Sequence, residues 1–543
     1  MFCCRFCLLL AVLSFGFSSA EGSLMTADGV TVELTVVDAE SGAVLPCRLY
    51  VQNTDSDEWH FGTSASPEGS AVEYRKQIGT TLSVEMHTTL SAHPILLQLA
   101  PGSYRVRAEH GKECIPAEQE MVVSSEPVKL QLVLKRFINM QAAGWYSGDT
   151  HVHRTMEDLP NLMLAEDLNV AMPLNYWVRD TTEIPSATGP PLEAKPIAVD
   201  ATHLIYPINT EYEIFSVSRQ RHTLGAVFVL NHKSPLNIPA PPVLTVAEEA
   251  RRQGAILDLD KHSWAWSMMI VPVMNVDLFE LSNNHNWRTQ FGFPQWTIEN
   301  APDWPEVERD AGAFTEKGWT EFGMQTYYAL LNGGFRMRVS GGTGAGVHPV
   351  PLGHGRVYVH TGGKFSYDRW IEHLNAGHSF VTTGPLMDLR LNGALPGTSW
   401  KKESPENSLT VTGVITSLNR LRAVEIIRNG VIAESLDLQP EQTADGAWKY
   451  TLKNDAVISG SGWIAVRCFE DLPNAKVSFA HSNPVFIDVA GQPLIPRRRD
   501  AEFFVRRMDE EIVRNTGVLP DDCLAEYRKA KEIYQTILDR AAD

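Results

Sequence analysis

Residues 140 to about 385 alternate short apolar runs with stretches of helical periodicity, and this alternation constrains the fold more than any other feature of the chain. The runs GAVFVLNH, GAILDLDKH and VDLFELSNN have the pattern of buried strands. Helices are predicted between such runs over 244–253, 321–331 and 367–377. Because strands that alternate with helices indicate a parallel sheet, open or closed into a barrel, we predict a central α/β segment.

All-β segments are predicted on both sides of this centre, as expected of a 543-residue chain that is too long for one core. Residues 24–137 contain alternating runs such as VKLQLVL, and 386–490 contain VEIIRNGVIAES, in which Asn429-Gly430 is a hairpin turn. Residues 499–543 carry an amphipathic helical pattern. The predicted order is a β-sandwich, the α/β segment over 140–385, a second β-sandwich and a helical tail.

The first β segment carries two short motifs of a known module. They are the D-x-x-[ST]-G start at Asp38, Ser41 and Gly42 and the P-G-x-Y-x-V strand from Pro101 to Val106. These motifs resemble the regulatory domain of carboxypeptidases. The resemblance implies a small β-sandwich that serves as a scaffold or adaptor.

The first twenty residues have the pattern of a secretory signal peptide. Arg5 precedes an apolar run from Leu8 to Phe17, and small residues lead to a cleavage site after Ala20. That run is too short to span a bilayer, and no later segment approaches about eighteen uninterrupted apolar residues. We therefore expect an exported protein, periplasmic or extracellular, without a membrane span.

The net charge limits the class of partner, and the cysteines limit the kinds of metal site and disulfide. A formal net charge of −18 disfavours nucleic acid, which requires a basic surface. Four cysteines remain after removal of the signal, and their wide spacing without C-x-x-C argues against a cysteine metal site. Export permits disulfides, and Cys47 with Cys114 is the expected pair because both lie in the first β segment.

The stretch GWYSGDTHVHR, residues 144–154, places Asp149, His151 and His153 at alternate positions. In a strand these side chains project from one face. Two imidazoles beside a carboxylate suit a divalent transition metal, with the carboxylate binding directly or orienting a ring. The alternative is a turn with two partly exposed histidines.

Further polar residues end the other predicted strands of the centre. In barrels of alternating strands and helices, the carboxyl ends of the strands build the active site. Imidazoles and carboxylates without thiolates suit Zn, Mn or Fe. A histidine such as His262, taken alone, is more often a hydrogen-bonded core residue. The strand-end residues are Glu211, Glu213, His232, His262, Asn283 and His285.

A family resemblance covers roughly residues 140–390. The segments GDTHVHR, NTEYEI, RHTLGAVFVLNH, ARRQGAILDLDKHSW and YYALLNGGFRMRVSGGTGAG, followed by GRVYVH and SFVTTGP, occur in order. They resemble the CehA/McbA-type metallohydrolases, a branch of the PHP (polymerase and histidinol phosphatase) superfamily that includes carbamate hydrolases. The resemblance implies a distorted (β/α)7-type barrel whose carboxyl-end mouth holds one to three divalent metal ions.

The resemblance also assigns residues. His151 and His153 match the opening metal pair, and Glu211 matches a glutamate that bridges metals. His222 and His262 match two further ligands. Asp258 and Asp260 lie on the same face of the strand before His262, and we expect them either to support the ligands as neighbouring carboxylates or to be salt-bridged barrel residues. His222 or Asp260 is the expected carrier of the proton during catalysis.

Two departures from the family pattern bear on activity. Residues 173–177 lack the histidine of the usual T-D-H-N segment, and Gly344 stands where the closing aspartate ligand belongs. His348, four residues later, is expected either to substitute as a ligand or to be a surface histidine. The site is therefore expected to hold fewer metals than a full cluster or to have lost turnover.

Two functions follow from these patterns. The first is a secreted metal-dependent hydrolase acting on an ester, amide, carbamate or phosphoester in a small-molecule or carbohydrate-linked substrate. The second is a degenerate barrel that binds a glycan or a partner at the cell surface or in the periplasm. Tryptophans beside the predicted mouth provide apolar or sugar-stacking walls, or simple packing. These are Trp177, Trp264, Trp266 and Trp287.

Overall fold

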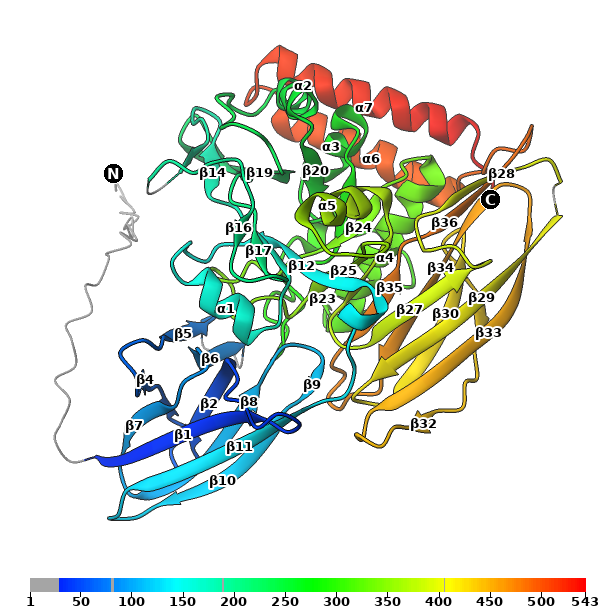
Figure 1. Cartoon of the computed structure of the whole chain (residues 1–543). Coiled ribbons are helices and arrows are strands. Elements are labelled where there is room, and N and C mark those ends of the chain that lie inside the picture. The colour runs from blue at the N-terminus through cyan, green and yellow to red at the C-terminus, as the bar shows by residue number, and fades with distance from the viewer. Residues whose placement is uncertain (1–28, 80–82, 188–189, 405) are drawn as a thin grey trace, which may run out of the picture.

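The computed structural model describes residues 29–79, 83–187, 190–404 and 406–543 (Figure 1). The predicted signal peptide, residues 1–20, lies outside the described residues. Within these ranges no helix is long and apolar enough to cross a membrane.

The N-terminal part consists of two packed sheets with strand orders β4-β7-β1-β11-β9 and β10-β8-β2-β6-β5, and β3 pairs with β2. Alternate residues of β1, such as Val32, Leu34 and Val36, are buried between the sheets. The strands are β1 Val30–Asp38, β2 Cys47–Asn53, β3 Trp59–His60, β4 Thr63–Ser64, β5 Ala71–Gln77, β6 Val84–Leu90, β7 Ile95–Leu99, β8 Gly102–Glu109, β9 Cys114–Ile115, β10 Ala117–Val123 and β11 Val128–Arg136.

The expected disulfide between Cys47 and Cys114 is wrong. All cysteines of the described chain are buried free thiols. Cys47 begins β2 in one sheet, whereas Cys114 begins β9 at the edge of the other. Burial raises the pKa of each of these two thiols to about 12, so both are neutral side chains of the interior.

The strands of the central segment lie in two mixed sheets, apart from β22 and β23, which pair only with each other. One has the order β15-β14-β18-β19-β20-β21-β24, and the other contains β16-β17-β13-β12-β25-β26 and continues into C-terminal strands. The pairs β20–β21 and β21–β24 are parallel, but β18–β19 and β19–β20 are antiparallel, so the sheets are not wholly parallel. A closed (β/α)7 barrel therefore stays a prediction. The strands are β12 Trp145–Val152, β13 Val170–Pro173, β14 Tyr176–Asp180, β15 Ser186–Ala187, β16 Ile197–Ala198, β17 Leu204–Ile205, β18 Thr210–Val217, β19 Gln220–Leu230, β20 Ile256–Leu259, β21 Leu278–Ser282, β22 Arg309–Asp310, β23 Ala313–Phe314, β24 Arg338–Gly341, β25 Arg356–His360 and β26 Ser379–Thr382.

The three helices predicted for the centre are present as α2, α4 and α5. Each ends at a glycine with positive φ, which are Gly254, Gly334 and Gly377. The hydroxyls of Thr315 and Ser366 cap the first turns of α4 and α5. The helical elements of the centre are η1 Gln141–Ala143, α1 Leu159–Ala165, α2 Val243–Gln253, α3 Ser267–Met274, η2 Ile298–Asn300, α4 Glu316–Gly333 and α5 Tyr367–Ala376.

The C-terminal strands form a second pair of packed sheets. One is β27-β29-β33-β32, and the other extends the central sheet because β26 pairs with β35. The predicted hairpin at Asn429-Gly430 is confirmed, and both residues have positive φ. The strands are β27 Leu386–Leu391, β28 Ser399–Lys402, β29 Glu406–Ser417, β30 Leu421–Arg428, β31 Val431–Ser435, β32 Glu441–Gln442, β33 Trp448–Ser459, β34 Gly462–Glu470, β35 Phe479–Ser482 and β36 Val485–Val489.

The tail forms two antiparallel helices, α6 Arg498–Asn515 and α7 Asp521–Asp539, that pack on the central segment beside α2 and α3 (Figure 1). The hydroxyl of Tyr534 donates to the carbonyl of Met268 at 2.7 Å. The carboxylate of Glu526 accepts from the amides of Val243 and Leu244 at the start of α2. The tail thus covers one side of the α/β segment.

Candidate metal centre

Two imidazoles lie side by side at the carboxyl end of β12. His151 and His153 occupy alternate positions of the chain around the end of β12, and their Nε2 atoms are 3.2 Å apart. Two ring nitrogens at this distance either share a proton or face a common cation.

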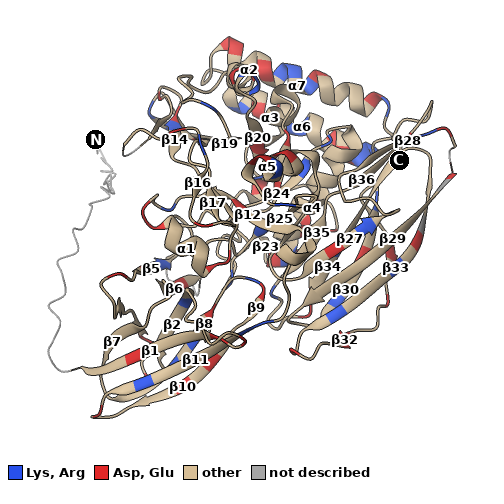
Figure 2. Ribbon diagram, in the orientation of Figure 1, with Lys and Arg blue, Asp and Glu red and all other residues tan. Residues whose placement is uncertain are grey.

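Carboxylates from the facing sheet approach these imidazoles. The Nε2 atom of His153 is 3.2 Å from Oε2 of Glu211 on β18. The Nδ1 atom of His151 is 3.0 Å from Oε1 of Glu280 on β21 and 3.6 Å from Oδ1 of Asp260, which follows β20. Glu213 lies two residues after Glu211 on β18. We call these six residues the metal cluster. Figure 2 shows acidic residues on the ribbon around β20.

The metal cluster contains three overlapping sets of potential ligands. In each set the ligand atoms lie within 4.8 Å of one another. Since His151, Glu211 and Asp260 each belong to two sets, ions in neighbouring sets would share ligands. The sets are His151, His153 and Glu211; His151, Asp260 and Glu280; and Glu211, Glu213 and Asp260.

The electrostatics of the metal cluster fit a divalent cation. Within the described residues, Oε2 of Glu211, Oδ1 of Asp260 and Oε2 of Glu280 are buried without a hydrogen-bond donor. Burial raises the pKa of Glu211 and of Glu280, and the charge of Asp260 raises both further. Burial also lowers the pKa of His153 to about 4, which favours the neutral imidazole that binds metals. A bound cation would remove the unfavourable burial of these oxygens.

A lysine also lies inside the metal cluster. The ammonium of Lys261, which is 3% exposed, bonds to the carboxylate of Asp260. Although burial lowers the pKa of Lys261, the carboxylates of Asp260, Glu213 and Glu211 outweigh it and raise the pKa above its usual value. The lysine therefore supplies one positive charge where a metal ion would supply two.

Asp149 and Asp258 are buried next to the metal cluster and hydrogen-bond to the segments that carry it. Asp149 accepts from the amides of His151 and Gly353 and from the hydroxyl of Thr343, so it holds the loop after β24 against β12. Among the described residues, its carboxylate thus binds backbone amides and a hydroxyl, and it belongs to none of the ligand sets. Asp258 accepts from the hydroxyl of Ser340 at 2.7 Å, and burial raises its pKa to about 8.

The structure does not bring His222 to the metal cluster. Glu211 pairs with Phe228 across the β18–β19 ladder, and His222 precedes Phe228 by six residues. Since a strand rises about 3.3 Å per residue, His222 lies about 20 Å along β19 from that pair. Its Nε2 atom is 2.8 Å from Oδ1 of Asn515 on α6. The roles predicted for His222, ligand and proton carrier, are not compatible with this position.

His262 and His348 lie outside the three ligand sets as well. The ring of His262 is packed among aromatic residues, with its centroid 4.5 Å from that of Phe322 and 4.9 Å from that of Trp319, and burial lowers its pKa to about 3. The ring of His348 lies 5.8 Å from that of His285. Both nitrogens of His262 and the Nδ1 atoms of the other two lack partners within the described chain.

Gly344, which stands where an aspartate was expected, has φ +61°. A Cβ atom there would lie 2.9 Å from Cδ2 of His348 and 3.0 Å from Cβ of Asn284. The loop therefore passes close to both side chains and leaves little room for a carboxylate.

Sequence reasoning missed Glu280 and Lys261. Glu280 lies between Phe279 and Leu281 in β21, and all residues of this strand are buried. A single acidic residue within an apolar strand was the available signal, because its charge requires a partner in the interior. Lys261 lies between the two predicted site residues Asp260 and His262, and its burial was not visible in the sequence.

No family model matches the chain, and no curated protein matches its sequence. Among solved structures, the chain is similar to a two-domain protein containing a predicted PHP-like metal-dependent phosphoesterase from Bacteroides vulgatus ATCC 8482. The identity is 10%, the TM-score is 0.28, and the match covers 64% of this chain and 95% of that one.

Proposed function

We propose that the chain is a metal-dependent hydrolase whose active site is the metal cluster. The observation that carries this proposal is the convergence of two imidazoles and four carboxylates from both central sheets, with buried oxygens that lack donors. A divalent ion, when bound, supplies Lewis acidity that activates a water molecule near neutral pH and polarises the bond to be cleaved.

Within the metal cluster, burial distinguishes the proposed metal ligands from the proposed proton acceptor. His151, Glu211, Asp260 and Glu280 are fully buried and are proposed as ligands together with His153. Asp260 belongs to two ligand sets, so we assign it to metal binding instead of proton transfer. Glu213 is the carboxylate of the cluster that is only half-buried, and we propose it as the group that accepts a proton from the attacking water.

The substrate class we propose is an ester, amide, carbamate or phosphoester, in line with the CehA/McbA-type resemblance. Export to the periplasm or the exterior and the (β/α)7 barrel belong to the same proposal. The metal is proposed as Zn, Mn or Fe, because the ligands are imidazoles and carboxylates without thiolates.

A second function is favoured by one observation, the ammonium of Lys261 beside Asp260. If this ammonium serves as the permanent cation of the site, the protein binds a glycan or a protein partner without turnover. Elemental analysis of protein purified without added metal separates the two functions. The hydrolase requires stoichiometric metal and chelator-sensitive cleavage of p-nitrophenyl acetate or bis(p-nitrophenyl) phosphate, and protein without metal or turnover refutes it.

A further inference from the structure

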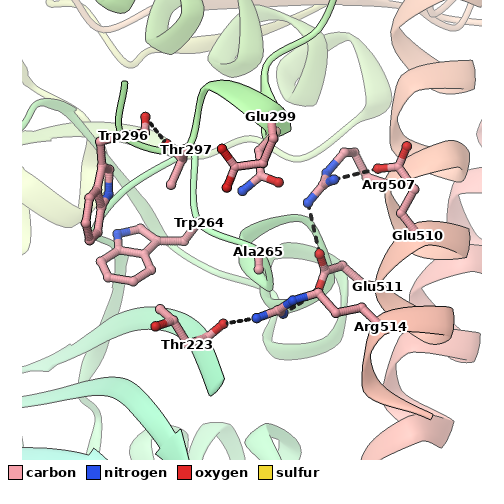
Figure 3. Close-up of a pocket in the computed structure, with 11 residues that line it drawn as sticks. Thr223, Trp264, Ala265, Trp296, Thr297, Glu299, Arg507, Glu510, Glu511 and Arg514 are labelled. Atoms are coloured by element: carbon pink, nitrogen blue, oxygen red, sulfur yellow. Dashed lines mark hydrogen bonds and ion pairs between the residues drawn. The ribbon is translucent and has the colours of Figure 1, made fainter. Parts of the chain in front are cut away.

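A cavity of about 380 Å³ lies between the central segment and the tail helix α6 (Figure 3). This volume is within the range of about 300–1,000 Å³ found for small-molecule sites. We call it the tail pocket, and its lining includes Thr223, Trp264, Trp296, Glu299 and the α6 residues Arg507, Glu510, Glu511 and Arg514.

One wall of the tail pocket is aromatic. The indoles of Trp264 and Trp296 lie edge to face with centroids 5.8 Å apart, and Figure 3 shows them together on one side of the cavity. Trp264 is 4% exposed. The Nε1 atoms of both indoles are buried and have no acceptor among the residues that the structure describes. This wall therefore offers the apolar faces of two indole rings to a ligand.

The opposite wall is charged but nearly neutral overall. The guanidinium of Arg507 binds the carboxylates of Glu510 and Glu511 at 2.5 and 3.0 Å. Arg514 binds Glu511 at 2.9 Å and also donates to the carbonyl of Thr223. With Glu299 at the rim, the lining carries three carboxylates and two guanidinium groups, a net charge of −1. A phosphate or another anion would need a positive surplus, so the tail pocket favours a neutral ligand.

The tail pocket adjoins the metal cluster through Trp264. The Nζ atom of Lys261, which binds Asp260 of the metal cluster, lies 5.2 Å from the centroid of the Trp264 ring. Phe215, which follows Glu211 and Glu213 at alternate positions of β18, has its ring centroid 5.8 Å from that of Trp264. Trp264 therefore lies between the metal cluster and the tail pocket.

We propose that the tail pocket binds a neutral carbohydrate ring, the non-reacting part of the substrate. An aromatic wall suits the apolar C–H face of a sugar, and the paired carboxylates and guanidinium groups opposite it suit hydroxyls that both donate and accept. We infer sugar binding from the tail pocket alone. That the sugar is part of the substrate rests on the proposed hydrolase function.

The test uses chelator-treated full-length protein, so that sugar binding is measured without turnover. Tryptophan fluorescence and calorimetric titrations are made with cellobiose, maltose, xylobiose and N,N′-diacetylchitobiose as probes. We expect saturable binding of at least one probe, weakened about tenfold in Trp296→Ala, which removes half of the aromatic wall. Glu299→Ala, which changes an exposed rim residue, should weaken the same binding and leave thermal unfolding unchanged.

Trp400→Ala is the matched control, because Trp400 is half-buried on β28 of the C-terminal sheets and outside the tail pocket. Binding by this variant should equal that of the wild type. The proposal is overturned if none of the probes binds, or if binding survives both Trp296→Ala and Glu299→Ala. Sugar binding without metal content or turnover would refute the hydrolase alone and retain the carbohydrate site.

Discussion

The Nε2 atom of His153 lies 3.2 Å from Oε2 of Glu211, although these residues are 58 positions apart and belong to different sheets. No hydrogen bond joins this oxygen to any described residue, so the two groups face each other as ligands of one cation would. We expect His151→Ala/His153→Ala to lower the metal content, because this double substitution removes ligands from two of the three sets and leaves only the set of Glu211, Glu213 and Asp260 complete. Elemental analysis of protein purified without added metal measures this loss.

His222→Ala provides the matched control for that experiment. His222 resembles a family ligand in sequence but binds Asn515, about 20 Å along β19 from the strand position opposite Glu211. This variant should retain the metal content of the wild type. Loss of metal in His222→Ala would show that the cluster is assembled differently from the geometry described above.

Glu211→Gln and Glu280→Gln should differ in metal stoichiometry. Glu211 belongs to two ligand sets, whereas Glu280 belongs to one. If more than one ion binds, Glu280→Gln should retain the ion held by His151, His153 and Glu211, and Glu211→Gln should lose more. Metal titration followed by mass spectrometry under native conditions counts the ions, and equal losses in both variants would contradict the assignment of separate sets.

How much of this site the sequence predicted depends on which residues carried local periodicity. The alternation of His151 and His153, and of Glu211 and Glu213, follows from strand geometry alone, and all four lie in the metal cluster. His222 was assigned from its motif, without the register of the β18–β19 ladder, which shifts between Ile214 and Ser216.

Contacts between elements far apart in the chain could not be predicted from the sequence. The amphipathic stripe of the tail predicted a docked helix, but not that Arg507 and Arg514 would line a pocket against Trp264 and Trp296. Likewise, Cys47 and Cys114 permitted a disulfide by their number and location, and only the three-dimensional structure shows that both are free thiols.

His481 should make folding stability depend on pH. Its Nδ1–H donates to the carbonyl of Ser482 and its Nε2 accepts from the hydroxyl of Tyr328 at 2.8 Å, an arrangement that requires the neutral ring. Burial lowers the pKa of His481 from 6.5 to about 3. Between these two values the unfolded chain binds the proton and the folded chain does not, so stability falls as the pH decreases from 6.5 towards 3.

His481→Gln should reduce that dependence. One proton contributes about 1.4 kcal/mol per pH unit to the free energy of unfolding, and the variant lacks this contribution between pH 6.5 and 3. Urea unfolding of both proteins at pH 7 and at two acidic pH values gives the slopes. Equal slopes for the two proteins would mean that His481 is protonated in the folded state.

Lys261→Met tests whether the buried ammonium competes with metal. In metal-free protein the substitution leaves Asp260 without its cation, and breaking such a buried pair costs about 3–5 kcal/mol. The same change removes a positive charge from the space between the carboxylates, so a divalent ion should bind more tightly than in the wild type. We expect a lower free energy of unfolding without metal, restored by Zn²⁺ or Mn²⁺, and a higher affinity in competition with a chelator. Unchanged or weaker affinity would mean that the ammonium does not compete with the ion for the carboxylates.

Metal binding in Lys261→Met but not in the wild type would favour the non-catalytic binding protein, because the native lysine would then be the permanent cation of the site.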